Sequence, residues 1–221
     1  MPTATVVYLM IKVSQLDLSP GDRTKLKSIT WQQYKSILDA LTPHRSARAT
    51  YDNGRLEIMV PHQRYEDAKE IASDLIKALL EELNLEFRAL GSTTFERQAD
   101  LKAIEPDQCF YIQNESAIRG KSRIDLAIDP PPDLALEIDT AARTHVEVYE
   151  AIGIPELWRF SKSGLAMYRL QLGQYTSIEE SEIFPGLPLR DLLPYCMEQS
   201  RKLGRNVVMR DFRQWVRSGG S

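Results

Sequence analysis

Residues 130–139 read PPPDLALEID, and this stretch decides the fold that the sequence predicts. Three prolines end whatever element precedes them, and Asp133 opens a run in which aliphatic residues alternate with others. Successive side chains of a β-strand point to opposite faces. One face therefore carries Leu134, Leu136 and Ile138, and the other carries Ala135, Glu137 and Asp139. The stretch predicts a strand with one aliphatic face and one acidic face.

The acidic face indicates chemistry, because a buried carboxylate without a partner costs free energy. Glu137 and Asp139 are two residues apart, so their Cα atoms lie roughly 6 to 7 Å apart on one face. Two carboxylates at that spacing suit a hard divalent cation such as Mg²⁺. The alternative is an edge strand whose outer face is exposed to water. The stretch alone leaves both interpretations open.

Length and composition favour an ordinary globular protein. A chain of 221 residues with 43% hydrophobic and 27% charged residues predicts one domain with peripheral additions. Its net charge of −3 gives no overall attraction to nucleic acid, so such a partner needs a local basic patch. Two cysteines are too few for a disulfide framework, which indicates a reducing compartment. No stretch approaches the roughly 18 to 20 apolar residues of a membrane span. We expect a cytoplasmic protein without a membrane partner.

Outward from the central strand, the patterns predict a mixed α/β fold. A capping box at Thr30 and Gln33 opens a helix, and Asn53-Gly54 marks the turn of a hairpin over residues 46–60. An apolar stripe with spacings of three and four predicts a long helix after Pro61. The other expected elements are strands near 85–90, 92–96, 105–112 and 153–160, a hairpin turning near 173, a helix over 146–152, and two helices after 189.

Three parts follow from these patterns. We expect an N-terminal extension over residues 1–27, the main domain over 28–195, and a basic helical tail over 196–221. The tail contains six basic residues and one acid between positions 201 and 217, interleaved with Phe212 and Trp215. Such a run contacts phosphates or forms a solvated helix face whose aromatic residues pack inward.

The carboxylates predict a constellation on two strands. Asp133 lies roughly 13 Å from Glu137 along the same strand, which is too far for a shared ion. Asp107 belongs to another strand and can approach Glu137 if the two strands pair. Asp133 is then a turn residue whose side chain caps local backbone amides. Acids arranged in this way suit metal-assisted hydrolysis of a phosphodiester.

Four segments carry a resemblance to a known family: GSTTFER (91–97), EPDQCFYI (105–112), PPPDLALEID (130–139) and IGIPELWRF (152–160). They resemble the Uma-type family of putative restriction endonucleases, abundant in cyanobacteria, within the PD-(D/E)XK nuclease superfamily. The resemblance covers about residues 30 to 195. It implies a restriction-endonuclease-like fold, in which helices flank a twisted mixed sheet and the site lies where the sheet splays.

The resemblance also implies site residues. Asp107 matches the aspartate of the first motif, Glu137 the acid of the second, and Glu66 the glutamate of the long helix. The superfamily expects Lys two residues after Glu137, where this chain has Asp139. The family often takes a basic residue from the following helix instead, which here is His145. A neutral imidazole can accept a proton from water, although it lacks the permanent charge of lysine.

The predicted site therefore has three groups of residues. Asp107, Glu137, His145 and Glu66 are the expected catalytic residues, and Asp107, Glu137 and Asp139 the expected ligands of Mg²⁺ or Mn²⁺. Arg119, Lys121, Arg123 and Arg143 are the expected nucleic-acid contacts. Two alternatives stay open, since His145 is also read as a helix-start residue without a role, and Glu66 as a first-turn acid favoured by the helix dipole.

We predict a metal-dependent DNA endonuclease that forms a homodimer. The alternative is a degenerate, non-catalytic member of the fold that binds nucleic acid or protein, and a bare dimerising module is a third possibility. We further expect Glu156 at the surface and His62 in a loop without a role. The predicted core residues are Leu75, Ile76, Leu79, Leu134, Leu136, Ile138 and Trp158.

Overall fold

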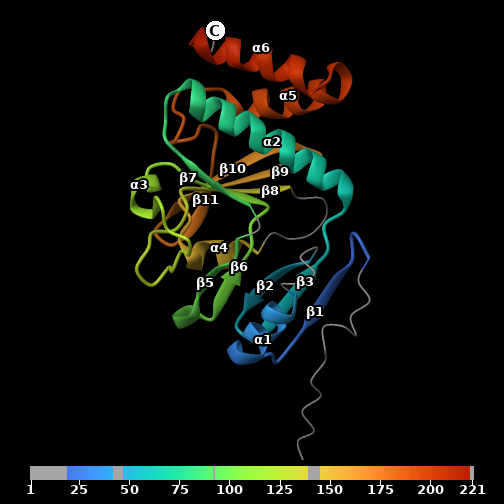
Figure 1. Cartoon of the computed structure of the whole chain (residues 1–221), viewed down its shortest axis with the longest axis vertical. Coiled ribbons are helices and arrows are strands. Elements are labelled where there is room, and N and C mark those ends of the chain that lie inside the picture. Colours follow the sequence, from blue (N-terminus) through green and yellow to red (C-terminus); the bar gives the residue numbers. More distant parts are fainter. Residues whose placement is uncertain (1–18, 42–46, 92, 139–144, 220–221) are drawn as a thin grey trace, which may run out of the picture.

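Two β-sheets with separate helices organise the chain (Figure 1). The computed structural model describes residues 19–41, 47–91, 93–138 and 145–219. In Figure 1 the six-stranded sheet lies in the middle of the molecule, below α2, α5 and α6. The five-stranded sheet lies at the end of the molecule opposite α6. The candidate site lies between them.

The six-stranded sheet has the order β11-β10-β9-β8-β7-β4. Its strands are β4 (Arg88–Leu90), β7 (Gln108–Tyr111), β8 (Leu134–Ile138), β9 (Glu156–Ser161), β10 (Gly164–Gln171) and β11 (Gln174–Ile178). Strands β8 and β9 run parallel, and the other neighbours run antiparallel. The expected mixed α/β class with a mixed sheet is confirmed. Because β8 has a neighbour on each side, the edge-strand alternative is wrong.

The five-stranded sheet is antiparallel and has the order β1-β3-β2-β6-β5. Its strands are β1 (Arg23–Leu26), β2 (Arg48–Asp52), β3 (Arg55–Met59), β5 (Phe95–Arg97) and β6 (Lys102–Ile104). The predicted hairpin is confirmed: Asn53 and Gly54 both have positive φ, 43° and 83°, as a tight turn between β2 and β3 requires. The sequence predicted one sheet, so the second is a finding, and β1 joins it from within residues 1–27.

The helices agree with their sequence signals. They are α1 (Trp31–Leu41), α2 (Gln63–Glu82), α3 (Glu115–Ile118), α4 (Val146–Ile152), α5 (Leu189–Leu203) and α6 (Arg205–Arg217), with a 3-10 turn at Gln98–Asp100. The capping box is formed in both directions: the Gln33 amide donates to Thr30 Oγ1 at 3.2 Å, and the Thr30 amide donates to Gln33 Oε1 at 2.8 Å. Among the residues that the structure describes, no helix is long and apolar enough to cross a membrane.

The main core lies between one face of the six-stranded sheet and helices α2, α5 and α6. The predicted core residues are confirmed there, with Ile138 partly buried at its margin and the others fully buried. The opposite face of the sheet packs on α4, and Ala135, Val148 and Tyr149 belong to one buried apolar cluster there. A third cluster joins α1 to one face of the five-stranded sheet. Each sheet therefore has its own apolar support.

The basic tail packs on α2 through helix α6. Its apolar residues Val208, Phe212 and Val216 are buried, as expected for a helix with one solvated face and one face packed inward. Its arginines pair with acids of α2: Arg205 donates to Asp74 at 2.7 Å, and Arg213 and Arg217 both donate to Glu82, at 3.0 and 2.6 Å. Three of the basic residues of the run are thus engaged within the chain.

The prediction that Glu156 lies at the surface is wrong. It is only 2% exposed, although we expected a surface acid. Its carboxylate accepts hydrogen bonds from Trp158 Nε1 at 2.9 Å, from the Ser181 hydroxyl at 2.8 Å and from the amide of residue 182 at 2.7 Å. A buried carboxylate is tolerated where several donors converge on it, and these donors fix the segment after β11 to the start of β9.

Candidate active site between the two sheets

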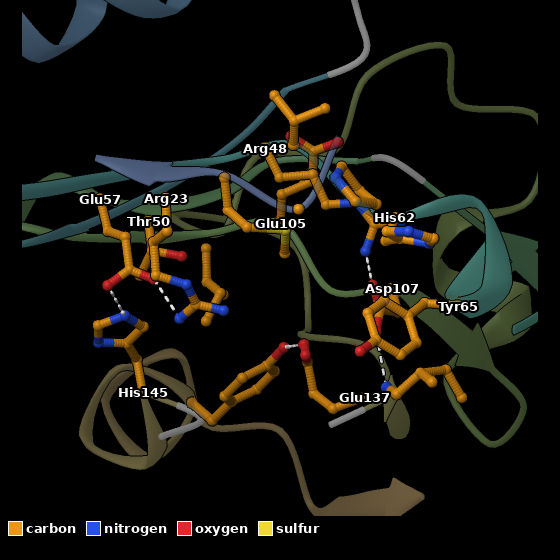
Figure 2. Close-up of a pocket in the computed structure, with 17 residues that line it drawn as sticks. Arg23, Arg48, Thr50, Glu57, His62, Tyr65, Glu105, Asp107, Glu137 and His145 are labelled. Atoms are coloured by element: carbon orange, nitrogen blue, oxygen red, sulfur yellow. Dashed lines mark hydrogen bonds and ion pairs between the residues drawn. The ribbon is translucent and has the colours of Figure 1, made fainter. Parts of the chain in front are cut away.

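A cavity of about 120 Å³ opens between the two sheets. The five-stranded sheet lines it with its polar face, which carries Arg23, Arg48, Thr50 and Glu57. The apolar face of the same strands packs on α1. The six-stranded sheet and its helices line the cavity with Tyr65, Glu137, Ile138, His145 and Tyr149. Figure 2 shows Asp107 and Glu137 on one side of this cavity and Glu57 and His145 on the other.

Asp107 stands where the chain passes from one sheet to the other. Residues 105–107 link β6 of the five-stranded sheet to β7 of the six-stranded sheet. The register pairs Gln108 with Leu136, so positions 107 and 137 come next on the paired strands. Asp107 reaches across to β8, where its Oδ2 accepts a hydrogen bond of 2.6 Å from the amide of Ile138. Asp107 and Glu137 therefore share one cavity wall.

Arg48 is the main partner of Asp107. Its guanidinium is buried, with 9% of the side chain exposed, and its Nη1 forms an ion pair with Asp107 Oδ1. Its Nη2 donates to Glu66 Oε1 at 3.0 Å. Glu66 also pairs with Lys69 and has 38% of its side chain exposed. Glu66 therefore reaches the cavity through Arg48, and it does not appear among the described residues that line the cavity.

Glu137 accepts a hydrogen bond from the hydroxyl of Tyr149 (Figure 2). Burial, and then the negative charge of Glu137, raise the pKa of the Tyr149 hydroxyl well above its ordinary value. Tyr149 therefore keeps its proton and acts as a donor. The phenol orients the carboxylate of Glu137 from helix α4.

His145 faces Glu57 of strand β3. The distance between His145 Nε2 and Glu57 Oε2 is 3.3 Å, and Arg23 Nη1 donates to Glu57 Oε1 at 2.6 Å. Burial alone raises the pKa of Glu57, but the contact with His145 and the charge of Arg23 outweigh it and lower the pKa to about 2. Glu57 is thus an ionised carboxylate, although its side chain is 8% exposed.

Asp133 lies apart from this cavity, as predicted. It is 1% exposed, and its carboxylate accepts from the amide of Ile112 at 2.7 Å and from the amide of Asn114 at 3.0 Å. The Asn114 side chain donates to the second oxygen at 2.7 Å. Asp133 thus accepts from backbone amides, as expected, but the expected local cap is wrong, because these amides lie 21 and 19 residues away in the chain.

Three of the four expected nucleic-acid residues, Arg119, Lys121 and Arg123, lie in the polar segment after β7. Arg119 forms three hydrogen bonds with Glu115, and Lys121 forms an ion pair with Asp129. Arg119 and Lys121 have 62% and 41% of their side chains exposed, and Arg123 is exposed as well. Arg143 and Asp139 lie outside the described residues. The roles of all these residues stay predictions.

The cavity offers side chains of the kind that bind a divalent cation. Mg²⁺ is commonly held by one or two carboxylates together with water and substrate phosphate, and Asp107 and Glu137 offer two carboxylates on one wall. Within the described ranges, which omit 139–144, no three His, Cys, Asp or Glu side chains are grouped so that they could hold a metal ion. A cation would therefore depend on these two acids and on groups beyond them.

Sequence analysis missed several residues that line the cavity, among them His62, Tyr149, Arg48 and Glu57. His62 was expected to have no role, and no role was assigned to Tyr149. Arg48 and Glu57 alternate with buried Ala49 and Leu56, a pattern that also describes side chains facing water. The only signal in the sequence was that charged residues alternate with apolar ones along these strands. This pattern does not say whether the charged face meets water or another part of the protein.

Three comparisons with known proteins bear on identity. A crystal structure described as "a putative nuclease belonging to DUF820", from Anabaena variabilis ATCC 29413, is similar to 73% of this chain and is itself covered over 90% of its length, with 16% sequence identity and a TM-score of 0.42. None of the curated proteins matches the chain. The family model Uma2, "Putative restriction endonuclease", matches residues 31–198, which confirms the resemblance carried by the four segments. This chain belongs to the Uma2 family.

Proposed function

We propose that this protein is a divalent-metal-dependent endonuclease that hydrolyses phosphodiester bonds of DNA. The observation that carries the proposal is the meeting of Asp107 and Glu137 on one wall of a cavity that is also lined by the buried guanidinium of Arg48. Membership of the Uma2 family supports a nuclease activity in general. Metal dependence and the DNA substrate are the parts that experiment must test.

In this proposal Asp107 and Glu137 hold Mg²⁺ or Mn²⁺. The bound cation would stabilise negative charge on the phosphate and lower the pKa of the attacking water. The amide of Ile138 and the hydroxyl of Tyr149 orient the two carboxylates, so the acids need little rearrangement. Asp139 is a third candidate ligand on the same face of the strand by sequence alternation.

DNA would approach across the basic segment after β7. Arg119 and Lys121 are exposed enough to exchange Glu115 and Asp129 for phosphates, and Arg123 and Arg143 extend the proposed contact. Such contacts position the backbone without reading its sequence. Cleavage of both strands requires two sites, so we also propose a homodimer, which sedimentation of the free and DNA-bound protein would test.

The test combines thermal melts with a plasmid-nicking assay. Mn²⁺ should raise the melting temperature of the wild type, because a ligand that binds only the native state stabilises it, by about 2.7 kcal/mol at one hundred times its Kd. Glu137→Gln should lose this shift and lower the nicking rate by at least about 100-fold. Glu70→Gln, which removes an exposed acid of α2, is the matched control and should behave like the wild type. Wild-type protein without a shift and without nicking would refute the proposal.

A non-catalytic binding protein is the second candidate. The observation in its favour is that His145 faces Glu57 across the cavity from Glu137, while Asp139 replaces the expected lysine. This candidate predicts a Mn²⁺ shift and DNA binding without nicking. His145→Lys distinguishes the two, since gain of nicking in this variant would identify a nuclease that had lost only its basic residue.

A further inference from the structure

The site proposed above lacks a permanent positive charge at the expected position. Asp139 replaces the lysine, and His145 contacts Glu57 on the opposite side of the cavity from Asp107 and Glu137. Hydrolysis increases the negative charge on the phosphate oxygens, so a cation close to the reacting phosphate lowers the barrier. The charge must then come from another cation at the cavity.

Arg48 is such a cation. It lines the cavity from strand β2, its side chain is 9% exposed, and it forms an ion pair with Asp107. A guanidinium is charged at every physiological pH and carries five N–H donors in a planar fork. Its two carboxylate partners, Asp107 and Glu66, do not exhaust these donors. Arg48 is thus fixed beside one proposed metal ligand with capacity to bind an oxyanion.

The position of Arg48 differs from those of the other cations nearby. Arg23 and His145 both contact Glu57, on the far side of the cavity. Arg159 is the register neighbour of Glu137 on β9, yet it is absent from the described residues that line the cavity. Lys69 forms ion pairs with Glu66 and Glu70 and is not among those lining residues either.

We propose that Arg48 supplies the positive charge that position 139 lacks, and that it contacts the phosphate of the scissile phosphodiester. The inference rests on the proposed nuclease function. In the reaction the water oxygen bonds to phosphorus as the bond to the leaving sugar oxygen breaks. Water gives up a proton to solvent, and the leaving oxygen takes one up from solvent. Arg48 transfers no proton, and it stabilises the phosphate oxygens electrostatically.

The competing explanation is that Arg48 only braces the fold. It joins β2, the link at Asp107 and helix α2, and removal of one partner from a buried ion pair is destabilising. A brace and a catalytic cation differ in two respects. Loss of a catalytic cation preserves metal binding while cleavage falls, and a lysine or an added guanidinium ion restores part of the lost rate.

The experiment measures Mn²⁺-induced melting shifts and plasmid nicking for wild type, Arg48→Met, Arg48→Lys and Arg159→Met. Arg55→Met, which removes an exposed arginine of the same hairpin, is the control. We expect Arg48→Met to keep the Mn²⁺ shift and to lose nicking by about 100-fold or more, and Arg48→Lys to retain more activity than Arg48→Met. If Arg48→Met does not fold, Arg48→Ala with millimolar guanidinium replaces it, and the expected result is partial recovery of nicking.

Each other outcome has a definite meaning. An active wild type together with an equally active Arg48→Met overturns the role of Arg48 and leaves the nuclease proposal intact. Equal loss of the Mn²⁺ shift and of nicking, without recovery by lysine or guanidinium, shows that Arg48 is a brace. Loss of nicking in Arg159→Met but not in Arg48→Met assigns the charge to Arg159. A wild type that neither nicks nor responds to Mn²⁺ refutes the nuclease proposal, and this inference with it.

Discussion

The two faces of strand β8 are stabilised in different ways. On one face Leu134 and Leu136 pack against the apolar stripe of α2, and neither side chain is exposed by more than 1%. On the other face Glu137 meets Tyr149 and shares its cavity with Asp107 and Arg48. The first face needs only matching apolar surfaces. The second needs particular donors and cations in particular places, so a substitution there removes specific polar contacts.

The largest effect on stability is expected on the apolar face. Leu136→Ala should lower the free energy of unfolding by about 2 to 5 kcal/mol, because it removes buried methyl groups and leaves a cavity between β8 and α2. Urea denaturation measures this change. Leu172→Ala, at a fully exposed leucine in the turn before β11, is the control. A near-neutral Leu136→Ala would mean that the faces of β8 are not organised as described.

Glu57 of the polar cavity should make the stability of the protein depend on pH. The pKa of Glu57 is lowered from an ordinary value of 4.5 to about 2, so its ionised form stabilises the folded state. That contribution is fully present above pH 4.5 and is lost as the pH falls towards 2. Glu57→Gln should therefore be less stable than the wild type at pH 6, by on the order of 2 kcal/mol, and the difference should shrink at acidic pH. Urea melts at pH 6, 4 and 3 test this, and a difference that did not change with pH would contradict it.

The smallest effect is expected at the surface between α6 and α2. Arg213→Ala removes contacts to Glu81 and Glu82, which are screened by solvent and salt. We expect a small loss of stability at low salt that disappears at about 1 M NaCl, where the Debye length is about 3 Å. DNA affinity should not change, because the proposed DNA contact is the segment after β7 and not the tail. A clear loss of DNA binding would instead assign the tail to the substrate contact.

Local patterns predicted the apolar half of the molecule well. The capping box at Thr30, the Asn53-Gly54 turn, the stripe on α2 and the alternation of β8 each depend on residues close in sequence. The pairing of Asp107 with the strand of Glu137 was also within reach, because both strands begin after a proline and an aspartate.

The polar half was not predictable in the same way. Arg48 and Glu57 lie on strands whose alternation fits a solvated face equally well, and only the second sheet turns that face towards the cavity. Glu156 was misjudged because its donors at residues 181–183 lie far along the chain. Long-range contacts of this kind have no local pattern. They follow from how the sheets are placed relative to each other.

The short link between the sheets bears on the order in which the protein folds. Residues 105–107 belong to the connection from β6 to β7, and Asp107 pairs with Arg48 of the five-stranded sheet while it accepts a hydrogen bond from the Ile138 amide of the six-stranded sheet. The two contacts are present together only when the two sheets have come together. The contact of Glu57 with His145 likewise joins strands and helices from distant parts of the chain. Contacts between residues that are remote in sequence form slowly, because the entropy of closing the intervening loop is lost first. We therefore expect the cavity to be assembled late, after the β2–β3 hairpin and helix α2 are in place.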